Sequence, residues 1–176
     1  SVGEVAGLQP LIEACRRRFP GEKILVTATS ATGLERAAPL ADLARLLPFD
    51  HPLWLRGPLR GLKVKAFIFG ETELWPVLIE KLGERGTPMI MVNGRLSEFS
   101  LKSYRLVHPW VTRVLGRLTA ICAANEKYRR RFIEFGADPG KVTAPGNAKY
   151  DSRPSIASAD GAAALRRSFF ETARPV

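Results

Sequence analysis

Short apolar runs alternate with segments of helical spacing along most of the chain. Each run is compact enough for a buried strand, and each is followed by apolar residues three or four positions apart. The strand-like runs lie at 23–27, 66–69, 88–93 and 120–124. Strands that alternate this regularly with helices predict an α/β fold, a parallel Rossmann-like sheet flanked by helices.

The predicted helices begin after small or polar residues and end at Gly, Pro or clustered cations. In the loop before the second helix, Ser30 or Thr32 either caps the helix or helps to bind an anion. His108-Pro109 is expected to kink or divide the fourth helix. The helices are predicted over 5–18, 34–47, 74–83, 101–118 and 127–135.

The stretch from Phe67 to Pro76 is predicted to form a strand, a tight turn and the start of a helix. Its apolar run stops at Gly70, and Glu71 and Glu73 follow directly. Ligands of open α/β sheets bind outside the carboxyl ends of the strands, so both carboxylates are candidate site residues. The alternative is that they only favour the helix N-terminus through its dipole, an effect of about 0.3–1 kcal/mol.

Polar residues occupy two further positions where chemistry is expected. Asn93 and Arg95 stand at the carboxyl end of the next strand, at the same predicted edge of the sheet. Near the beginning of the chain, Gly3 and Glu4 precede the first helix. A glycine there lets backbone amides approach a ligand, and a neighbouring carboxylate can act as a base.

The charge balance points to an anionic partner. The 176 residues include 27 Lys and Arg against 17 Asp and Glu, which gives a net charge of +10. Nucleic acid, a phosphorylated substrate and an anionic membrane all fit that sign. Cys15 and Cys122 have no metal-ligand spacing and are expected to be small core residues, which fits a reducing compartment. No apolar run reaches the roughly 18 residues that span a bilayer.

Residues 53–65 interleave apolar side chains with cations. One interpretation is a solvated connection with Trp54 in the core, and the other is a surface that faces a membrane. A similar mixture, with Tyr104, recurs over 101–118. The second interpretation predicts that the membrane-facing residues are Trp54, Arg56, Arg60, Lys63, Arg105, Trp110 and Arg113, with Lys65 and Arg117 as further cations.

Five ordered motifs resemble the amino-terminal half of the Kdo transferases, the 3-deoxy-D-manno-octulosonic acid transferases of lipopolysaccharide synthesis. The resemblance covers about residues 1–151. It departs from the family at Gly94, where Ala is usual, and at 148–150, where Leu-Lys-Phe is usual. The motifs are Ser1-Val-Gly-Glu4, Leu47-Pro-Phe-Asp50, Glu71-Thr-Glu-Leu-Trp-Pro76, Val92-Asn-Gly-Arg-Leu-Ser97 and Gly146-Asn-Ala-Lys-Tyr-Asp151.

The resemblance implies an enzyme, half of a GT-B glycosyltransferase that transfers Kdo from CMP-Kdo to a lipid A precursor without a metal or other cofactor. It implies that Glu4 is the general base of an inverting hydroxyl attack. It also implies peripheral association with the cytoplasmic face of the inner membrane of Gram-negative bacteria. The acceptor-binding residues would be Gly3, Glu71, Glu73, Asn93, Arg95 and Ser97.

The same resemblance divides the chain. Residues 1–151 are expected to be the acceptor domain, and 152–176 a linker and the start of a donor domain. The family's first strand is expected to precede Ser1, so the sequence is expected to be an excerpt that is inactive alone. Two alternatives stay open: another GT-B enzyme with a different nucleotide-sugar and acceptor, or a basic nucleic-acid-binding module, although no nucleic-acid-reading motif is present.

Overall fold

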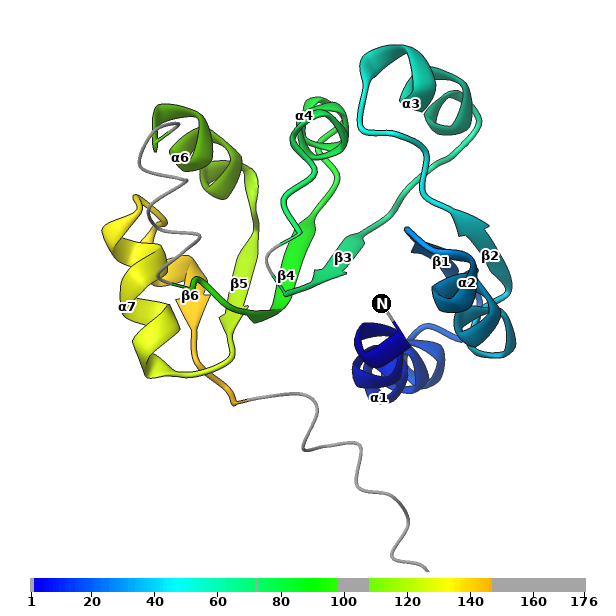
Figure 1. Cartoon of the computed structure of the whole chain (residues 1–176), viewed down its shortest axis with the longest axis horizontal. Helices are drawn as coiled ribbons and strands as arrows, with labels where there is room; N and C mark the ends of the chain where they lie inside the picture. The colour runs from blue at the N-terminus through cyan, green and yellow to red at the C-terminus, as the bar shows by residue number, and fades with distance from the viewer. Residues whose placement is uncertain (1, 72, 98–107, 147–176) are drawn as a thin grey trace, which may run out of the picture.

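The computed structural model describes residues 2–71, 73–97 and 108–146, without the side chains at positions 2–4 and 6. Helices and strands alternate through this part of the chain (Figure 1). In chain order they are α1 (Val2–Arg18), β1 (Leu25–Ala28), α2 (Ala31–Ala37), η1 (Ala38–Leu40), β2 (Leu43–Leu46), α3 (Pro52–Arg60), β3 (Phe67–Gly70), α4 (Pro76–Glu84), β4 (Met89–Gly94), α6 (His108–Arg117), β5 (Ala120–Ala123), α7 (Glu126–Glu134), η2 (Pro139–Lys141) and β6 (Val142–Thr143).

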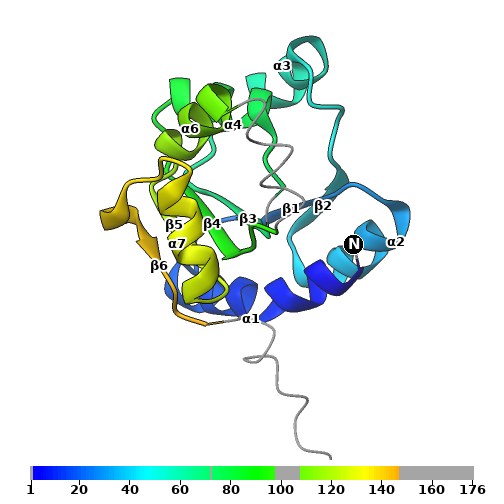
Figure 2. The same cartoon turned by 60° about the vertical axis from the view of Figure 1, so that its left-hand side comes forward.

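Every strand pairing in the described part of the chain is parallel, which confirms the predicted α/β class. The strands form two sheets, one with the order β1-β2 and one with the order β3-β4-β5-β6. Figure 2 shows β5, β4, β3, β1 and β2 following one another across the molecule. Helices connect successive strands of the larger sheet, as parallel pairing requires.

One apolar core joins the larger sheet to the helices that cover it. Helices α6, α4 and α3 lie side by side on one side of the sheet, and α1 lies on the opposite side (Figure 1). The core is closed by fully buried side chains of the central strands and of α4, α6 and α7. The largest of its fully buried side chains are Phe132, Ile79, Leu82, Met89, Met91, Leu96, Leu118, Ile121 and Val111.

The prediction of one helix over 34–47 is wrong after Ala37. Helix α2 ends at Ala37, a short 3₁₀ turn follows, and Leu43–Leu46 is a strand paired with β1. Pro39 has no amide hydrogen to donate, so the helical ladder stops there. The apolar residues that suggested helical spacing instead extend along β2, where Leu43 and Leu46 are exposed.

The other predicted elements are confirmed within one to three residues where they fall on described residues. Ser30 caps α2, because its Oγ accepts a hydrogen bond from the Gly33 amide at 3.2 Å. His108-Pro109 stands at the described start of α6. Residues 53–60 of the segment 53–65, for which two interpretations stood open, lie in helix α3. The predictions for 101–107 and for the linker and helix over 152–171 lie outside the described residues.

Gly94, where the resembled family usually has Ala, lies in a closely packed site. A Cβ placed on it would be 2.9 Å from Met91 Sδ and 3.0 Å from Phe132 Cε2. Phe132 is fully buried and therefore has little room to move. The Phe132 ring of α7 thus occupies part of the space that a methyl group at position 94 would need.

Candidate functional site

The carboxyl ends of β3 and β4 carry the two non-glycine residues of positive φ in the described chain. Glu71 has φ 58° and Asn93 has φ 54°. Side chains other than glycine adopt this conformation at a cost, about 1–3 kcal/mol where it is unfavourable, and such residues cluster at functional sites. The two strands are neighbours in the sheet, so the strained residues meet at one edge, as the sequence predicted for these positions.

A bulge in β4 accounts for the conformation of Asn93. The pairing of β4 with β5 is regular at Met91 and Ile121 but shifts before Gly94, which lies opposite Ala123. The bulged strand has one more residue than its partner over this interval. Bulges of this kind turn a side chain away from its regular direction and occur next to active sites.

Asn93 and Glu71 contact each other through their side chains. Asn93 Nδ2 lies 3.5 Å from Glu71 Oε1, a long hydrogen bond that Asn93 donates. Asn93 is only 8% exposed, and its Oδ1 is buried without a hydrogen-bond partner among the described atoms. Buried polar groups are normally satisfied, so an unpartnered carbonyl oxygen here is a candidate acceptor for a ligand's hydroxyl or amine.

Asp50 occupies the N-terminus of α4. Its Oδ2 accepts a hydrogen bond from the Val77 amide at 3.0 Å, and its Oδ1 accepts one from the Leu78 amide at 2.9 Å. The first turn of α4 contains no acidic residue of its own. Asp50 therefore caps this helix from a distant part of the chain, and Glu71 and Glu73 precede its first residue. Asp50 belongs to the Leu47-Pro-Phe-Asp50 motif, and no local pattern in the sequence predicts its role at a helix 27 residues away.

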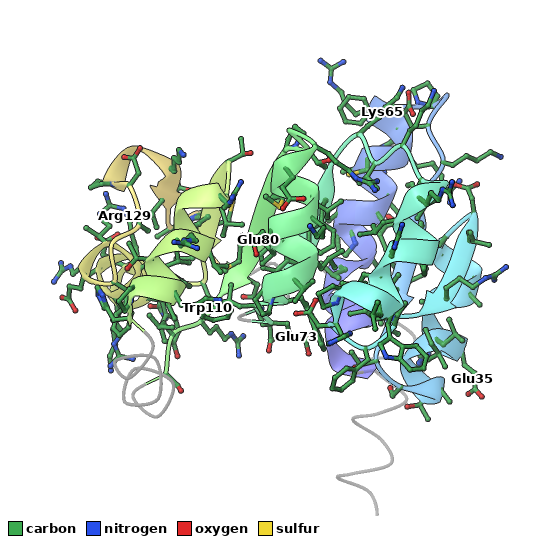
Figure 3. All side chains as sticks on the ribbon, turned by 90° about the horizontal axis from the view of Figure 1, so that it is seen from above. Glu35, Lys65, Glu73, Glu80, Trp110 and Arg129 are labelled. Carbon is green, nitrogen blue, oxygen red and sulfur yellow. The ribbon has the colours of Figure 1, made fainter. Side chains whose placement is uncertain are left out.

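The other candidates lie around this edge with different exposure. Glu73 is exposed, and Figure 3 shows it at the end of α4. Arg95 is half-buried and Ser97 is exposed, directly after β4. Both take part in interactions of their own. The structure thus brings Glu71 and Asn93 into contact and places Glu73, Arg95 and Ser97 on the connections that leave the same two strands.

Gly3 and Glu4 lie in the first turn of α1, inside the helix rather than before it. Leu8, one helical turn after Glu4, lies beside the end of β3: a Cβ placed on Gly70 would be 3.9 Å from Leu8 Cδ1. Four residues of α-helix rise about 6 Å. The backbone of Glu4 is therefore one helical turn from Leu8. Leu8 lies beside Gly70, the residue before Glu71.

Apolar side chains are exposed near the start of α3. Phe49 is 77% exposed, Leu53 75% and Trp54 64%, so the interpretation that placed Trp54 in the core is wrong. Trp110, in the first turn of α6, is 39% exposed. Because α3 and α6 each lead into the amino end of a parallel strand, their own N-termini lie towards the carboxyl edge. The exposed aromatic residues therefore border the edge that carries Glu71 and Asn93.

The cations expected to face a membrane extend further along the helices. Arg56, Arg60, Lys63 and Arg113 are exposed, whereas Arg105 lies outside the described residues. Lys65 forms an ion pair with Glu22. Phe49 and Leu53 are not among the residues that the sequence predicts to face a membrane. The signal that could have found them is the run of apolar residues on both sides of Asp50-His51-Pro52.

None of the described helices is long and apolar enough to cross a bilayer. The described His, Cys, Asp and Glu side chains include no group of three arranged to hold a metal ion. Cys15 and Cys122 are free thiols and half-buried.

Curated relatives carry one recurrent name. The chain is 32% identical to a 3-deoxy-D-manno-octulosonic acid transferase of Haemophilus influenzae over 154 residues, 86% of this chain and 36% of that protein. It is 30% identical to the protein of that name from Chlamydia muridarum, over 85% of this chain and 36% of that protein. A bifunctional glycosyltransferase/methyltransferase of Fusobacterium nucleatum is 29% identical over 85% of this chain. The chain spans little more than a third of the first two.

Structure and family comparisons complete the assignment. The fold matches half of a GT-B protein, a UDP-GlcNAc 2-epimerase of Neisseria meningitidis crystallised with UDP-GlcNAc. The TM-score is 0.62 and the identity 13%, over 97% of this chain and 49% of that one. This likeness shows the fold alone. The model of the 3-deoxy-D-manno-octulosonic-acid transferase family matches residues 1–152, so the chain belongs to the Kdo transferase family.

Proposed function

We propose that this chain is the acceptor-binding half of a glycosyltransferase that moves Kdo from CMP-Kdo to a lipid A precursor. Membership of the Kdo transferase family supports the transferred sugar. The likeness to one half of a GT-B protein supports the division of labour between two domains. Residues 1–151 form the acceptor domain in this proposal, and 152–176 lead towards the donor domain.

The observation that carries the proposal is the contact between Glu71 and Asn93. Two strained residues at adjacent strand ends hold a carboxylate beside a buried, unpartnered carbonyl oxygen. Both oxygens accept hydrogen bonds, as recognition of a sugar hydroxyl requires. Arg95 follows Asn93 by two residues, and a guanidinium suits the acceptor's phosphates. We assign Glu73, Ser97 and Gly3 to the same acceptor wall.

The reaction is an inverting displacement in which Glu4 is the base. The acceptor hydroxyl oxygen attacks the anomeric carbon of Kdo and forms the new glycosidic bond. The bond from that carbon to the phosphate oxygen breaks, and CMP leaves with the electron pair. The hydroxyl proton passes to the Glu4 carboxylate. No metal is required in this scheme, because the leaving phosphate is held by the donor domain.

A transfer assay tests this proposal against the alternatives. The parent enzyme, given labelled CMP-Kdo and a tetraacylated lipid A precursor, should form a labelled lipid. Transfer from another nucleotide-sugar, with none from CMP-Kdo, would favour a different GT-B reaction. Sequence-independent binding of nucleic acid without transfer would favour the basic nucleic-acid module.

We also propose that the start of α3 rests on an anionic membrane, the cytoplasmic face of the inner membrane, where the acceptor resides. Phe49, Leu53 and Trp54 supply exposed apolar contacts, and Arg56 follows in the next turn. Each cation close to such a surface contributes about 1 kcal/mol of binding. The surface borders the carboxyl edge, so a lipid head group could reach Glu71 while its acyl chains stay in the bilayer.

Liposome sedimentation checks this membrane contact. The chain should sediment with anionic vesicles and be released by salt, because electrostatic attraction is screened over a Debye length of about 8–10 Å. Trp54→Ala together with Leu53→Ala should weaken sedimentation. Leu43→Ala is the matched control, since Leu43 is also exposed but lies on β2. Equal binding to neutral and anionic vesicles that does not change with salt concentration would contradict the proposal.

A further inference from the structure

We propose that Asp50 is a positioning residue that fixes the connection from Glu71 to Trp75, and with it the carboxylates of the acceptor wall. The assignment to the acceptor rests on the function proposed above. The structural part of the inference stands on contacts within this chain. The N-terminus of α4 faces the site. The position of this end of the helix depends on a side chain from a different part of the fold.

Helix α4 has no local cap. Its N-cap residue, Trp75, makes no side-chain capping hydrogen bond, and Pro76 occupies the first position. The next two amides, of Val77 and Leu78, both donate to Asp50, one to each carboxylate oxygen. A carboxylate at a helix N-terminus satisfies orphan amides and interacts favourably with the helix dipole. Asp50 performs both tasks from 27 residues earlier in the chain.

Asp50 is itself held in place. The segment begins at β2, and the Leu47 amide donates to the Ala28 carbonyl oxygen at 2.8 Å. The following residue, His51, caps α3, because its Nδ1 accepts a hydrogen bond from the Leu53 amide at 3.3 Å. The side chains of two consecutive residues, Asp50 and His51, therefore cap the N-termini of two neighbouring helices, α4 and α3. Asp50 ties the segment that leaves the smaller sheet to the helix that follows β3.

The opposite ends of α3 and α4 are also joined. Arg85, directly after α4, donates from one guanidinium nitrogen to the Leu59 carbonyl oxygen at 2.7 Å and to that of Leu62 at 3.3 Å. Helix α4 is thus anchored to the α3 region at both ends. The anchor at its C-terminus lies far from the site, whereas the Asp50 anchor lies beside it.

Only five residues connect the end of β3 to the start of α4, from Glu71 to Trp75. Glu71 is fixed at one end by the hydrogen bond of its amide to the Val92 carbonyl oxygen at 2.9 Å. Asp50 fixes the other end through α4. Glu73, Leu74 and Trp75 lead directly into α4, so they must shift when the N-terminus of α4 shifts. Removal of the Asp50 carboxylate should therefore displace Glu73 and loosen the Glu71–Asn93 contact.

Two substitutions and one matched control test this inference in the parent enzyme. Asp50→Ala removes both acceptors, and Asp50→Asn keeps one acceptor oxygen without the charge. The control is Asp42→Asn: Asp42 Oδ2 also accepts a backbone hydrogen bond, from the Ile24 amide at 2.8 Å, and Asp42 pairs with Arg16. Asp42 precedes β2, at the amino end of the smaller sheet, away from the candidate site.

Acceptor kinetics are the first measurement. For Asp50→Ala, kcat/KM for the lipid acceptor should fall by about 10- to 100-fold, the equivalent of losing hydrogen bonds to a charged group. KM for CMP-Kdo should stay within about twofold of wild type, because the donor is held elsewhere. For Asp50→Asn, kcat/KM for the lipid acceptor should lie between the values of wild type and Asp50→Ala. An equal loss in Asp42→Asn at matched thermal stability would overturn the inference.

Amide hydrogen exchange is the second measurement and does not depend on the reaction. Exchange at Val77 and Leu78 should accelerate at least about tenfold in Asp50→Ala, with a smaller increase at Glu73 and Leu74. Unchanged exchange at these amides would overturn the inference even if the wild type is active. If the wild type shows no Kdo transfer but exchange still accelerates in Asp50→Ala, the proposed function would be refuted. The positioning role of Asp50 would still be supported.

Discussion

Replacement of Glu4 by Gln in the parent enzyme is expected to lower kcat by about 10²–10⁴-fold, the usual contribution of general base catalysis. Glutamine keeps the size of the side chain but cannot accept the acceptor's proton. Position 4 lies one turn before Leu8, which lies beside the end of β3. The candidate base thus belongs to a helix that lies beside Gly70, the residue before Glu71.

A control on the same helix separates catalysis from helix stability. Glu13 is exposed on α1 and accepts a hydrogen bond from Gln9, four residues earlier. Glu13→Gln should leave kcat within about twofold of wild type, because this contact contributes only a few tenths of a kcal/mol. Circular dichroism should show both variants folded. Near-normal turnover in folded Glu4→Gln would remove Glu4 from the mechanism.

Residues 1–176 alone are expected to form no product from CMP-Kdo and the lipid A precursor, while the parent enzyme does. The chain spans little more than a third of the length of these curated relatives. The nucleotide is proposed to bind the donor domain, which lies outside this chain. Without that half, the anomeric carbon of Kdo is not held against the acceptor hydroxyl. Such positioning contributes up to about 7–11 kcal/mol to a reaction barrier.

The comparison requires equal molar amounts of the chain and the parent, with product detected as labelled lipid. Addition of the separately produced remainder of the parent is the control, since partial recovery would show that the chain is folded and competent. Robust transfer by residues 1–176 alone would show that the donor site and the domain boundary are misplaced.

The strands next to the site could be predicted from the sequence because the runs of hydrophobic residues alone identify them. Phe67–Gly70 and Met89–Gly94 are apolar runs that end in glycine and polar residues, so their carboxyl ends were visible. The parallel order then brings Glu71 and Asn93 together. Local pattern and global fold agree at these positions, as is common in natural sequences.

Other features depend on contacts that no local pattern encodes. The strand at Leu43–Leu46 is short and exposed, and only its pairing with β1 distinguishes it from helix. The role of Asp50 depends on amides 27 and 28 residues away. The positive φ of Asn93 arises from a bulge against β5. In each case the partner element, rather than the segment's own propensity, decides the outcome.

Acceptor binding to the carboxyl edge of β3 and β4 is the most direct test of the account. A deacylated, water-soluble analogue of the lipid A precursor can be titrated into the isotope-labelled chain and followed by NMR. The account predicts chemical-shift changes concentrated at Glu71, at the Asn93 side-chain amide and at Arg95. The changes at Glu71 and Arg95 should be reduced in Asn93→Ala, which lacks the side-chain amide. Saturable binding with shifts confined to other parts of the chain, unaffected by Asn93→Ala, would contradict it.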